Sequence, residues 1–193
     1  MKILILNGSP RKKGTIVNLL KAVAEGARSI GNDLEWVDVY DLHMKPCTAC
    51  MKCRPDGPCR LSQDDAHEVG RKIKEAGGLV VGTPTHWGNM STQLKCLFDR
   101  NVPVFMGEKS NGMPLPRQKG KKAVIVTACT TPWPFDRILP ESRGAIRAVR
   151  EVLGYGGYKI IGKVVKPGSK KKPEISEKDL NKARKVGSRF AGA

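Results

Sequence analysis

The sequence has few acidic residues, few aromatic residues and no apolar run of membrane length. Asp and Glu number 18 against 35 Lys and Arg, and aromatic residues make up 5% of the chain. The aromatics do not interleave with the basic runs and no nucleic-acid-binding motif is present, which disfavours nucleic acid as a partner. No basic, apolar and small N-terminal pattern precedes the first apolar run. We therefore expect a cytoplasmic protein with no membrane span, whose cysteines stay reduced and available for metal.

The low acidic content leaves a formal net charge of +17. Such a surface attracts anions, which include nucleic acid, an acidic electron-transfer protein and a phosphorylated cofactor. A solvated basic face without a specific partner explains the same composition equally well. The excess charge lies late in the chain, at Lys119, Lys121, Lys122, Arg137, Arg143, Arg147, Arg150, Lys170, Lys171 and Lys172.

Two nucleotide-binding fingerprints are also absent. The loop from Asn7 to Thr15 matches neither G-x-x-x-x-G-K-[ST] nor G-x-G-x-x-G, although it joins an apolar strand to a helix. Backbone N–H groups, a helix N-terminus, the hydroxyls of Ser9 and Thr15 and the charge of Arg11 together suit a single phosphate monoester. An ordinary strand-to-helix turn remains the alternative.

Cysteine, by contrast, is concentrated in one short segment. The spacing Cys47-x2-Cys50-x2-Cys53-x5-Cys59 suits one cluster wrapped by one loop, as in [4Fe–4S] proteins. Structural zinc more often uses two separated knuckles, and disulfides between such close neighbours would join almost nothing. We therefore predict a redox centre, flanked by the basic residues Lys45, Lys52, Arg54 and Arg60. The remaining cysteines, Cys96 and Cys129, we expect to pack in the core or a loop.

Strand and helix patterns alternate along the whole chain, which predicts one α/β domain over 1–193 with a parallel sheet covered on both faces. We expect a cysteine-rich loop over 46–60, a long basic loop over 103–122, a flexible basic linker over 168–173 and a basic C-terminal helix over 175–190. The predicted strands are 2–7, 34–40, 79–83, 123–129 and 158–165, and the predicted helices between them are 16–27, 65–76, 91–100 and 141–153.

Ligands of such sheets bind at the carboxyl ends of the strands. The third strand ends in a loop whose Thr85, Trp87 and Asn89 offer a hydroxyl, a flat ring and an amide, which suits a planar heterocycle. His86 in that loop has no partner visible in the sequence, and simple loop packing is the alternative to a binding role. The fourth strand ends at Thr127–Cys129, so three polar loops would hold a phosphate at one end and a ring at the other.

Three segments in order resemble the flavodoxin-like FMN proteins of the NADPH-dependent FMN reductase group, and most closely the iron–sulfur flavoproteins. They are Gly8–Arg11, the four cysteines followed by Asp64–Asp65, and Pro84–Asn89, the last continued by Leu94-Lys95 and Phe98–Arg100. Two departures stand out. Gly14-Thr15-Ile16 replaces the usual Gly-Asn-Thr of the phosphate loop, and His86 replaces the tyrosine of many relatives.

The resemblance implies a flavodoxin-like three-layer sandwich with a five-stranded parallel sheet that binds FMN non-covalently. The FMN-binding residues it implies are Ser9, Arg11, Gly14, Thr15, Ile16, Pro84, Thr85, His86, Trp87, Gly88, Asn89, Thr127 and Cys129. It further implies a [4Fe–4S] cluster on Cys47, Cys50, Cys53 and Cys59.

As a function, the resemblance implies that electrons pass between a reduced donor and an acceptor through both centres in a homodimer or homotetramer. The donor or partner would be NAD(P)H or a ferredoxin. One alternative is an NAD(P)H-dependent FMN or quinone reductase without a cluster, whose cysteines are free or bind zinc. A redox-sensing or nucleic-acid-associated binding protein is another.

Overall fold

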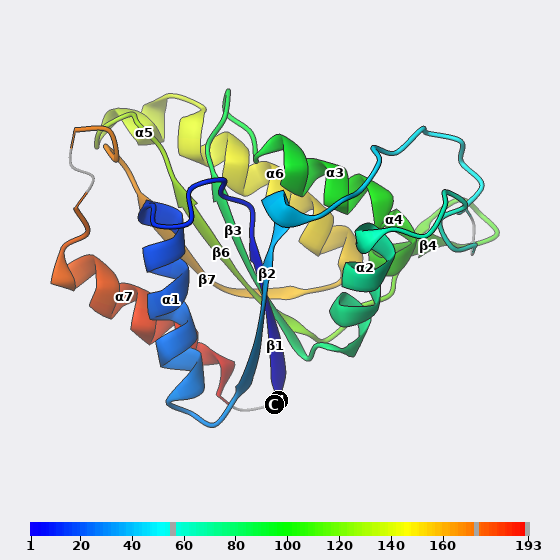
Figure 1. The fold of residues 1–193 in the computed structure, drawn as a ribbon, viewed down its shortest axis with the longest axis horizontal. Helices are drawn as coiled ribbons and strands as arrows, with labels where there is room; N and C mark the ends of the chain where they lie inside the picture. Colours follow the sequence, from blue (N-terminus) through cyan, green and yellow to red (C-terminus); the bar gives the residue numbers. More distant parts are fainter. Residues whose placement is uncertain (55–56, 172–173, 192–193) are drawn as a thin grey trace.

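The computed structural model describes residues 1–54, 57–171 and 174–191, so the predicted charge at Lys172 lies outside the described residues. A parallel sheet at the centre has the strand order β2-β1-β3-β6-β7, which confirms the predicted flavodoxin-like fold class (Figure 1). Its strands are β1 (Lys2–Asn7), β2 (Asp33–Asp38), β3 (Gly78–Pro84), β6 (Lys122–Ala128) and β7 (Lys159–Lys166).

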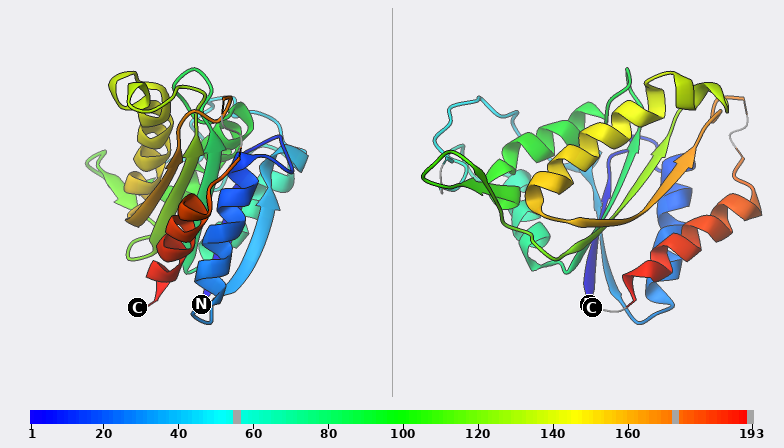
Figure 2. Two further views of the ribbon diagram at one scale, coloured as in Figure 1. Left: turned by 90° about the vertical axis from the view of Figure 1, so that its left-hand side faces the viewer. Right: turned by 180° about the vertical axis from the view of Figure 1, so that it is seen from behind.

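Helices cover both faces of this sheet (Figures 1 and 2). Along β1, Ile3 and Ile5 enter one core and Leu4 and Leu6 enter the other, because successive side chains of a strand point to opposite faces. The first core lies under α1 (Thr15–Arg28) and α7 (Glu177–Gly187), and α7 continues into the 3-10 turn η2 (Ser188–Phe190). The second core lies under α2 (Asp65–Glu75), α3 (Thr92–Arg100) and α6 (Glu141–Gly156).

Two glycines allow α1 and α7 to pack in direct backbone contact. A Cβ at Gly26 would lie 1.9 Å from the carbonyl oxygen of Arg184, and a Cβ at Gly187 would lie 2.0 Å from that of Val23. Since real Cβ atoms do not approach so closely, any larger residue here would force the two helices apart.

Two expected elements differ in the structure. The strand predicted over 34–40 stops at Asp38, and a 3-10 turn, η1 (Val39–Asp41), turns the chain toward the cysteine loop. The loop predicted over 103–122 contains α4 (Val102–Phe105) and an antiparallel pair, β4 (Met106–Glu108) and β5 (Pro114–Pro116). This is a short local hairpin of the kind that tolerates prolines at an edge, and the many Pro and Gly residues concealed it.

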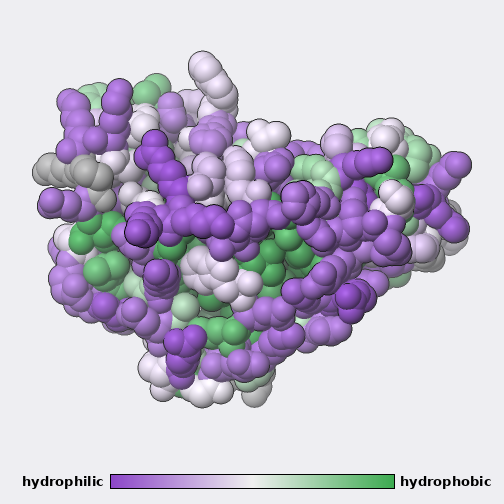
Figure 3. All heavy atoms as spheres, viewed as in Figure 1, coloured by the Kyte–Doolittle hydropathy of each residue, from purple (hydrophilic) through white to green (hydrophobic). Residues whose placement is uncertain are grey.

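The remaining element is the short helix α5 (Phe135–Ile138), which precedes α6. Among the described residues, no helix is long and apolar enough to span a bilayer. Figure 3 shows hydrophilic residues over most of the face seen in Figure 1, with only small apolar areas between them.

Candidate functional site

Loops from the carboxyl ends of four strands meet around a cavity of about 300 Å³. This edge of the sheet is where ligands of doubly wound folds bind. The cavity is lined by Ser9, Pro10, Arg11, Gly14, Thr15, Ile16, Pro84, Thr85, His86, Ala128, Cys129, Thr130 and Ser169.

The first of these loops leaves the start of α1 open to a ligand. Ser9 Oγ accepts a hydrogen bond from the Arg11 backbone N–H at 3.2 Å, and the Gly14 N–H donates to the Arg11 carbonyl at 3.1 Å. Gly14 is the N-cap and no side chain caps the helix. The N–H groups of the first turn therefore lack a side-chain acceptor, which suits an anion such as a phosphate group.

The loops after β3 and β6 are joined to each other. The Thr85 N–H donates to the Ala128 carbonyl at 3.0 Å, and the hydroxyl oxygens of Thr85 and Thr127 lie 3.3 Å apart. Thr127 thus supports the cavity wall through Thr85. These contacts hold the ends of two neighbouring strands at one side of the cavity.

The rest of the β3 loop lies outside this cavity. His86 and Asn89 exchange backbone hydrogen bonds of 2.9 Å, which closes a two-residue turn with positive φ at Trp87 (49°) and Gly88 (68°). Trp87 is fully exposed. The structure thus brings Pro84, Thr85 and His86 to the cavity, whereas Trp87, Gly88 and Asn89 do not line it and their predicted FMN contacts stay a prediction.

Cys129, in the loop after β6, also lines this first cavity. Its thiol donates to the Thr131 carbonyl at 3.4 Å, and burial raises the pKa of this thiol. Both the hydroxyl and the N–H of Ser169 donate to the Cys129 carbonyl at 3.0 Å. Sequence reasoning missed Ser169, although it follows the carboxyl end of β7, so the rule applied to the other strands could have found it.

All four clustered cysteines line a second cavity of about 290 Å³. Cys47 and Cys50 are exposed, whereas Cys53 and Cys59 are half-buried. Within the described residues, no three His, Cys, Asp or Glu side chains are yet grouped to hold a metal ion. The structure therefore brings the sulfurs to one cavity without placing them in ligand geometry.

The backbone of the cysteine loop has two unusual residues. Ala49 (φ 52°) precedes Cys50, and Met51 (φ 58°) follows it, in a region that side chains other than glycine rarely adopt. Strain of this kind is more common at ligand-binding loops than elsewhere.

The surroundings of the clustered cysteines also shift the pKa values of their thiols. Burial raises the pKa of Cys53, and the nearby thiols of Cys59, Cys47 and Cys50 raise it further. A hydrogen bond from the Lys52 backbone lowers the pKa of Cys50. Four such thiols around one cavity are a donor set suited to a [4Fe–4S] cluster.

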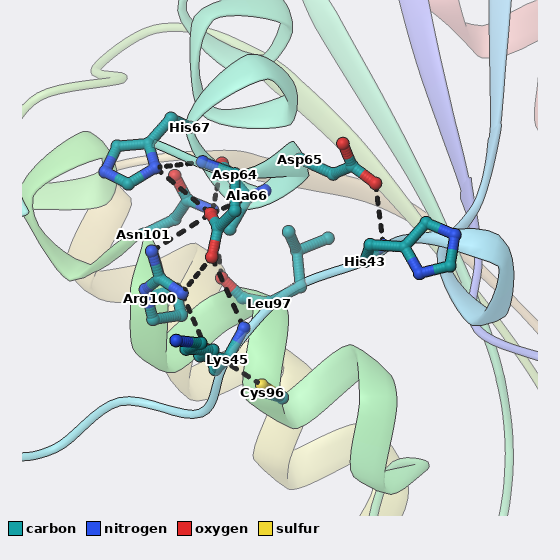
Figure 4. Close-up of polar contacts among 10 residues, drawn as sticks. All are labelled: His43, Lys45, Asp64, Asp65, Ala66, His67, Cys96, Leu97, Arg100 and Asn101. Atoms are coloured by element: carbon teal, nitrogen blue, oxygen red, sulfur yellow. Dashed lines mark hydrogen bonds and ion pairs between the residues drawn. The ribbon is translucent and has the colours of Figure 1, made fainter. Parts of the chain in front are cut away.

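Ion pairs and hydrogen bonds anchor both ends of the cysteine loop (Figure 4). At its start, the backbone N–H groups of His43 and Lys45 donate to the carboxylates of Asp65 and Asp64, at 2.6 and 3.3 Å. At its end, Asp64 is the N-cap of α2 and forms a capping box with His67. Entry and exit of the loop are thereby tied to the same helix terminus.

Arg100 completes this anchor from α3. Its side chain is fully buried, binds Asp64 with two hydrogen bonds of 2.6 and 3.0 Å, and donates to the Lys45 carbonyl at 2.6 Å. Burial lowers the pKa of the guanidinium, but hydrogen bonds to Asp64 and to the nearby Cys59 thiol outweigh this and raise it. Its Nε is buried without a hydrogen-bond partner among the described residues.

The cysteines outside the loop differ from each other. Cys129 is buried, as predicted, but Cys96 is only partly buried, and its sulfur lies 3.9 Å from the Lys45 carbonyl oxygen. The side chain of Cys96 therefore lies beside the start of the cysteine loop rather than in the core.

Residues 1–146 match the family model of the NADPH-dependent FMN reductases. The chain belongs to this family. The matched segment contains the described lining residues of both cavities except Ser169.

Relatives of known name agree with this membership. An iron–sulfur flavoprotein of Methanocaldococcus jannaschii is 35% identical over 107 residues, which are 55% of this chain and 55% of that protein. The chain therefore spans about half the length of this relative. An iron–sulfur flavoprotein of Archaeoglobus fulgidus is 29% identical over 100% of this chain and 80% of its own length.

A solved structure of similar fold is an FMN-dependent NADH-azoreductase of Bacillus anthracis in complex with FMN. Its TM-score is 0.73 at 14% identity, and the match covers 100% of both chains. At this low identity the likeness establishes the fold alone.

Proposed function

We propose that this chain is an FMN-dependent oxidoreductase that passes electrons between a reduced donor and an acceptor, with FMN in the first cavity and a [4Fe–4S] cluster on the cysteine loop. The observation that carries the proposal is the sorting of the candidate residues into two cavities. The uncapped start of α1 lies at one cavity, and all four clustered cysteines line the other. Family membership and the names of the relatives support the same two groups.

Each part of the first cavity has a defined task in this proposal. The first-turn N–H groups of α1, with Thr15 and Arg11, would bind the phosphate of FMN. Pro84–His86 and the segment from Ala128 to Thr130 would hold the ring. The contacts between these two segments keep that wall rigid.

Bound FMN accepts two electrons at once and can release them singly, whereas an iron–sulfur cluster carries one electron at a time. Cys47, Cys50, Cys53 and Cys59 would hold the cluster. The positive charges of Arg100, Arg54 and Arg60 at the same cavity would offset its negative charge.

Donor and assembly are further parts of the proposal. NAD(P)H is the proposed donor, supported by the NADPH dependence in the family's description, and a ferredoxin is the alternative. The two cavities share no lining residue. In Figures 1 and 2 the cysteine loop (cyan) lies at the opposite end of the molecule from the start of α1 (blue). A homodimer or homotetramer that places the cluster of one copy near the FMN of another would connect them.

One observation favours a second candidate function. The cysteines are not grouped as metal ligands within the described residues, as expected for an NAD(P)H-dependent FMN or quinone reductase without a cluster. In that case Cys47 and Cys50 remain exposed thiols.

Assays of flavin, iron, sulfide and zinc on protein purified without oxygen distinguish the two functions. FMN with about four irons and four sulfides per chain supports the two-centre carrier. FMN without iron favours the second candidate, and absence of bound flavin contradicts both.

A further inference from the structure

A third cavity, of about 330 Å³, adjoins the cysteine loop but belongs to neither proposed cofactor. Its walls are the face of α2, the segment after α3 and the end of the cysteine loop. It is lined by Gly57, Pro58, Cys59, Gln63, His67, Gly70, Arg71, Lys74, Arg100, Asn101, Pro103, Val104 and Arg117.

The described residues that line this cavity include several cations and no carboxylate. His67, Arg71 and Lys74 form one stripe of α2, because residues four and three apart lie on the same helix face. Arg100 and Arg117 face them from the other walls. No Asp or Glu among the described residues lines the cavity, although Asp64 behind it pairs with Arg100 and with His67.

His67 adds a hydrogen-bond donor without an acceptor. Its Nδ1 lies 3.2 Å from the Asp64 backbone nitrogen and 3.1 Å from Asp64 Oδ1. When Nδ1 accepts the Asp64 N–H, as in the capping box, the proton of the neutral ring is on Nε2. Protonation of the ring would leave Nε2 a donor as well. This Nε2 is buried and has no hydrogen-bond partner among the described residues. A buried donor without an acceptor is costly, and a bound anion would satisfy it.

The floor of the cavity is rigid. Asn101 donates to the carbonyls of Ala66 and Leu97, both at 3.0 Å, and so joins α3 to α2. Gly70 permits this approach, since a Cβ there would lie 2.3 Å from Asn101 Oδ1. A rigid floor holds His67 and Arg100 in place before any ligand arrives.

We propose that this cavity binds a phosphate group, held by His67, Arg71, Lys74, Arg100 and Arg117. The proposal does not depend on FMN or on the cluster. Because Cys59 and Arg100 line both this cavity and the cysteine cavity, occupancy would also brace the end of the cysteine loop.

The three histidines allow a local test. In histidine-labelled, FMN-saturated protein, inorganic phosphate is titrated at constant ionic strength while the ring nitrogens are followed by NMR. We expect a saturable shift at His67, whereas His86, which lines the FMN cavity, stays unchanged. A non-saturating shift, or a shift at His86 alone, would overturn the proposal.

Two double variants of equal charge change provide the matched control. Arg71→Gln with Lys74→Gln removes two exposed cations of the cavity and should weaken binding about tenfold. Arg147→Gln with Arg150→Gln removes two exposed cations from a shallow hollow on α6 that also contains Glu151, and should leave binding unchanged. Equal weakening in both doubles would mean general charge screening and would overturn the site.

The same titration with adenosine monophosphate in place of inorganic phosphate distinguishes a phosphate ester from the free phosphate ion as the ligand. Tighter binding than that of phosphate assigns a phosphate ester, and weaker binding assigns the free ion. If neither shifts the His67 signal, the proposal is wrong, whatever the flavin and iron assays show.

Discussion

Arg100 and Asp64 form a two-bond ion pair that joins α3 to the first turn of α2 and to the start of the cysteine loop. The Arg100 side chain is fully buried and that of Asp64 is 15% exposed. The pair is therefore largely shielded from solvent, and removal of one partner leaves a buried charge uncompensated.

Arg100→Gln should destabilise the apoprotein, because Asp64 loses its partner and the Lys45 carbonyl loses a donor. We expect a loss of about 3 kcal/mol in the free energy of unfolding, measured by urea denaturation. Arg54→Gln removes an exposed cation that, like Arg100, lines the cysteine cavity. It should change the free energy of unfolding by less than about 0.5 kcal/mol. Equal effects in the two variants would show that the buried pair has no special role.

The pair also makes stability depend on pH. Burial raises the pKa of Asp64, but hydrogen bonds from Arg100 and the Lys45 N–H outweigh this, and the net shift is downward. A carboxyl with a lowered folded-state pKa contributes stability above its unfolded pKa and loses it as pH falls through the folded value. Urea unfolding from neutral pH to about pH 2 should therefore show an acid loss of stability. Asp64→Asn should have a smaller acid loss, and an unchanged profile would contradict this assignment.

The contact between α1 and α7 predicts a large effect of one methyl group. Gly26→Ala should lower the free energy of unfolding by about 1–3 kcal/mol, because the added Cβ would meet the Arg184 carbonyl. Gly154→Ala is the matched control, since this helical glycine has open space at its Cβ. It should raise stability by about 0.5–1 kcal/mol. Thermal unfolding measures both.

Iron binding should depend on the cysteines of the cysteine loop and not on Cys96. Cys50→Ser should reduce iron per chain in anaerobically reconstituted protein, whereas Cys96→Ser should retain it because Cys96 does not line the cysteine cavity. FMN content should be unchanged in both, since neither residue lines the FMN cavity. Equal iron loss in the two variants would contradict the predicted ligand set.

The phosphate loop can be tested through Ser9. Ser9→Ala removes the hydroxyl that accepts the Arg11 N–H and so loosens the loop before α1. We expect FMN affinity to fall about tenfold, or about 1.4 kcal/mol, in a fluorescence titration. Ser188→Ala, at the exposed end of α7, should leave FMN affinity unchanged.

Local patterns in the sequence were sufficient for the central sheet and for the long helices α1, α2, α3, α6 and α7. The apolar run of β1, the helical spacing of Val17, Leu20 and Val23 and the cap at Asp64 are all local signals. Ligands of parallel sheets bind at the carboxyl ends of the strands, and this rule predicted that Ser9, Thr85 and Cys129 lie at one edge of the sheet. In the structure the three residues line one cavity.

Only the tertiary structure decided which of these residues meet. The position of Ser169 beside Cys129 depends on a contact between segments 40 residues apart in the chain. The β4–β5 pair and the exposed turn at Trp87 are closed by local bonds that the residue pattern did not reveal. The unpartnered Nε2 of His67 likewise becomes visible only once α2 and the segment after α3 are packed together. Periodicity reports which face of an element is buried, but it carries no information on which distant side chain lies opposite.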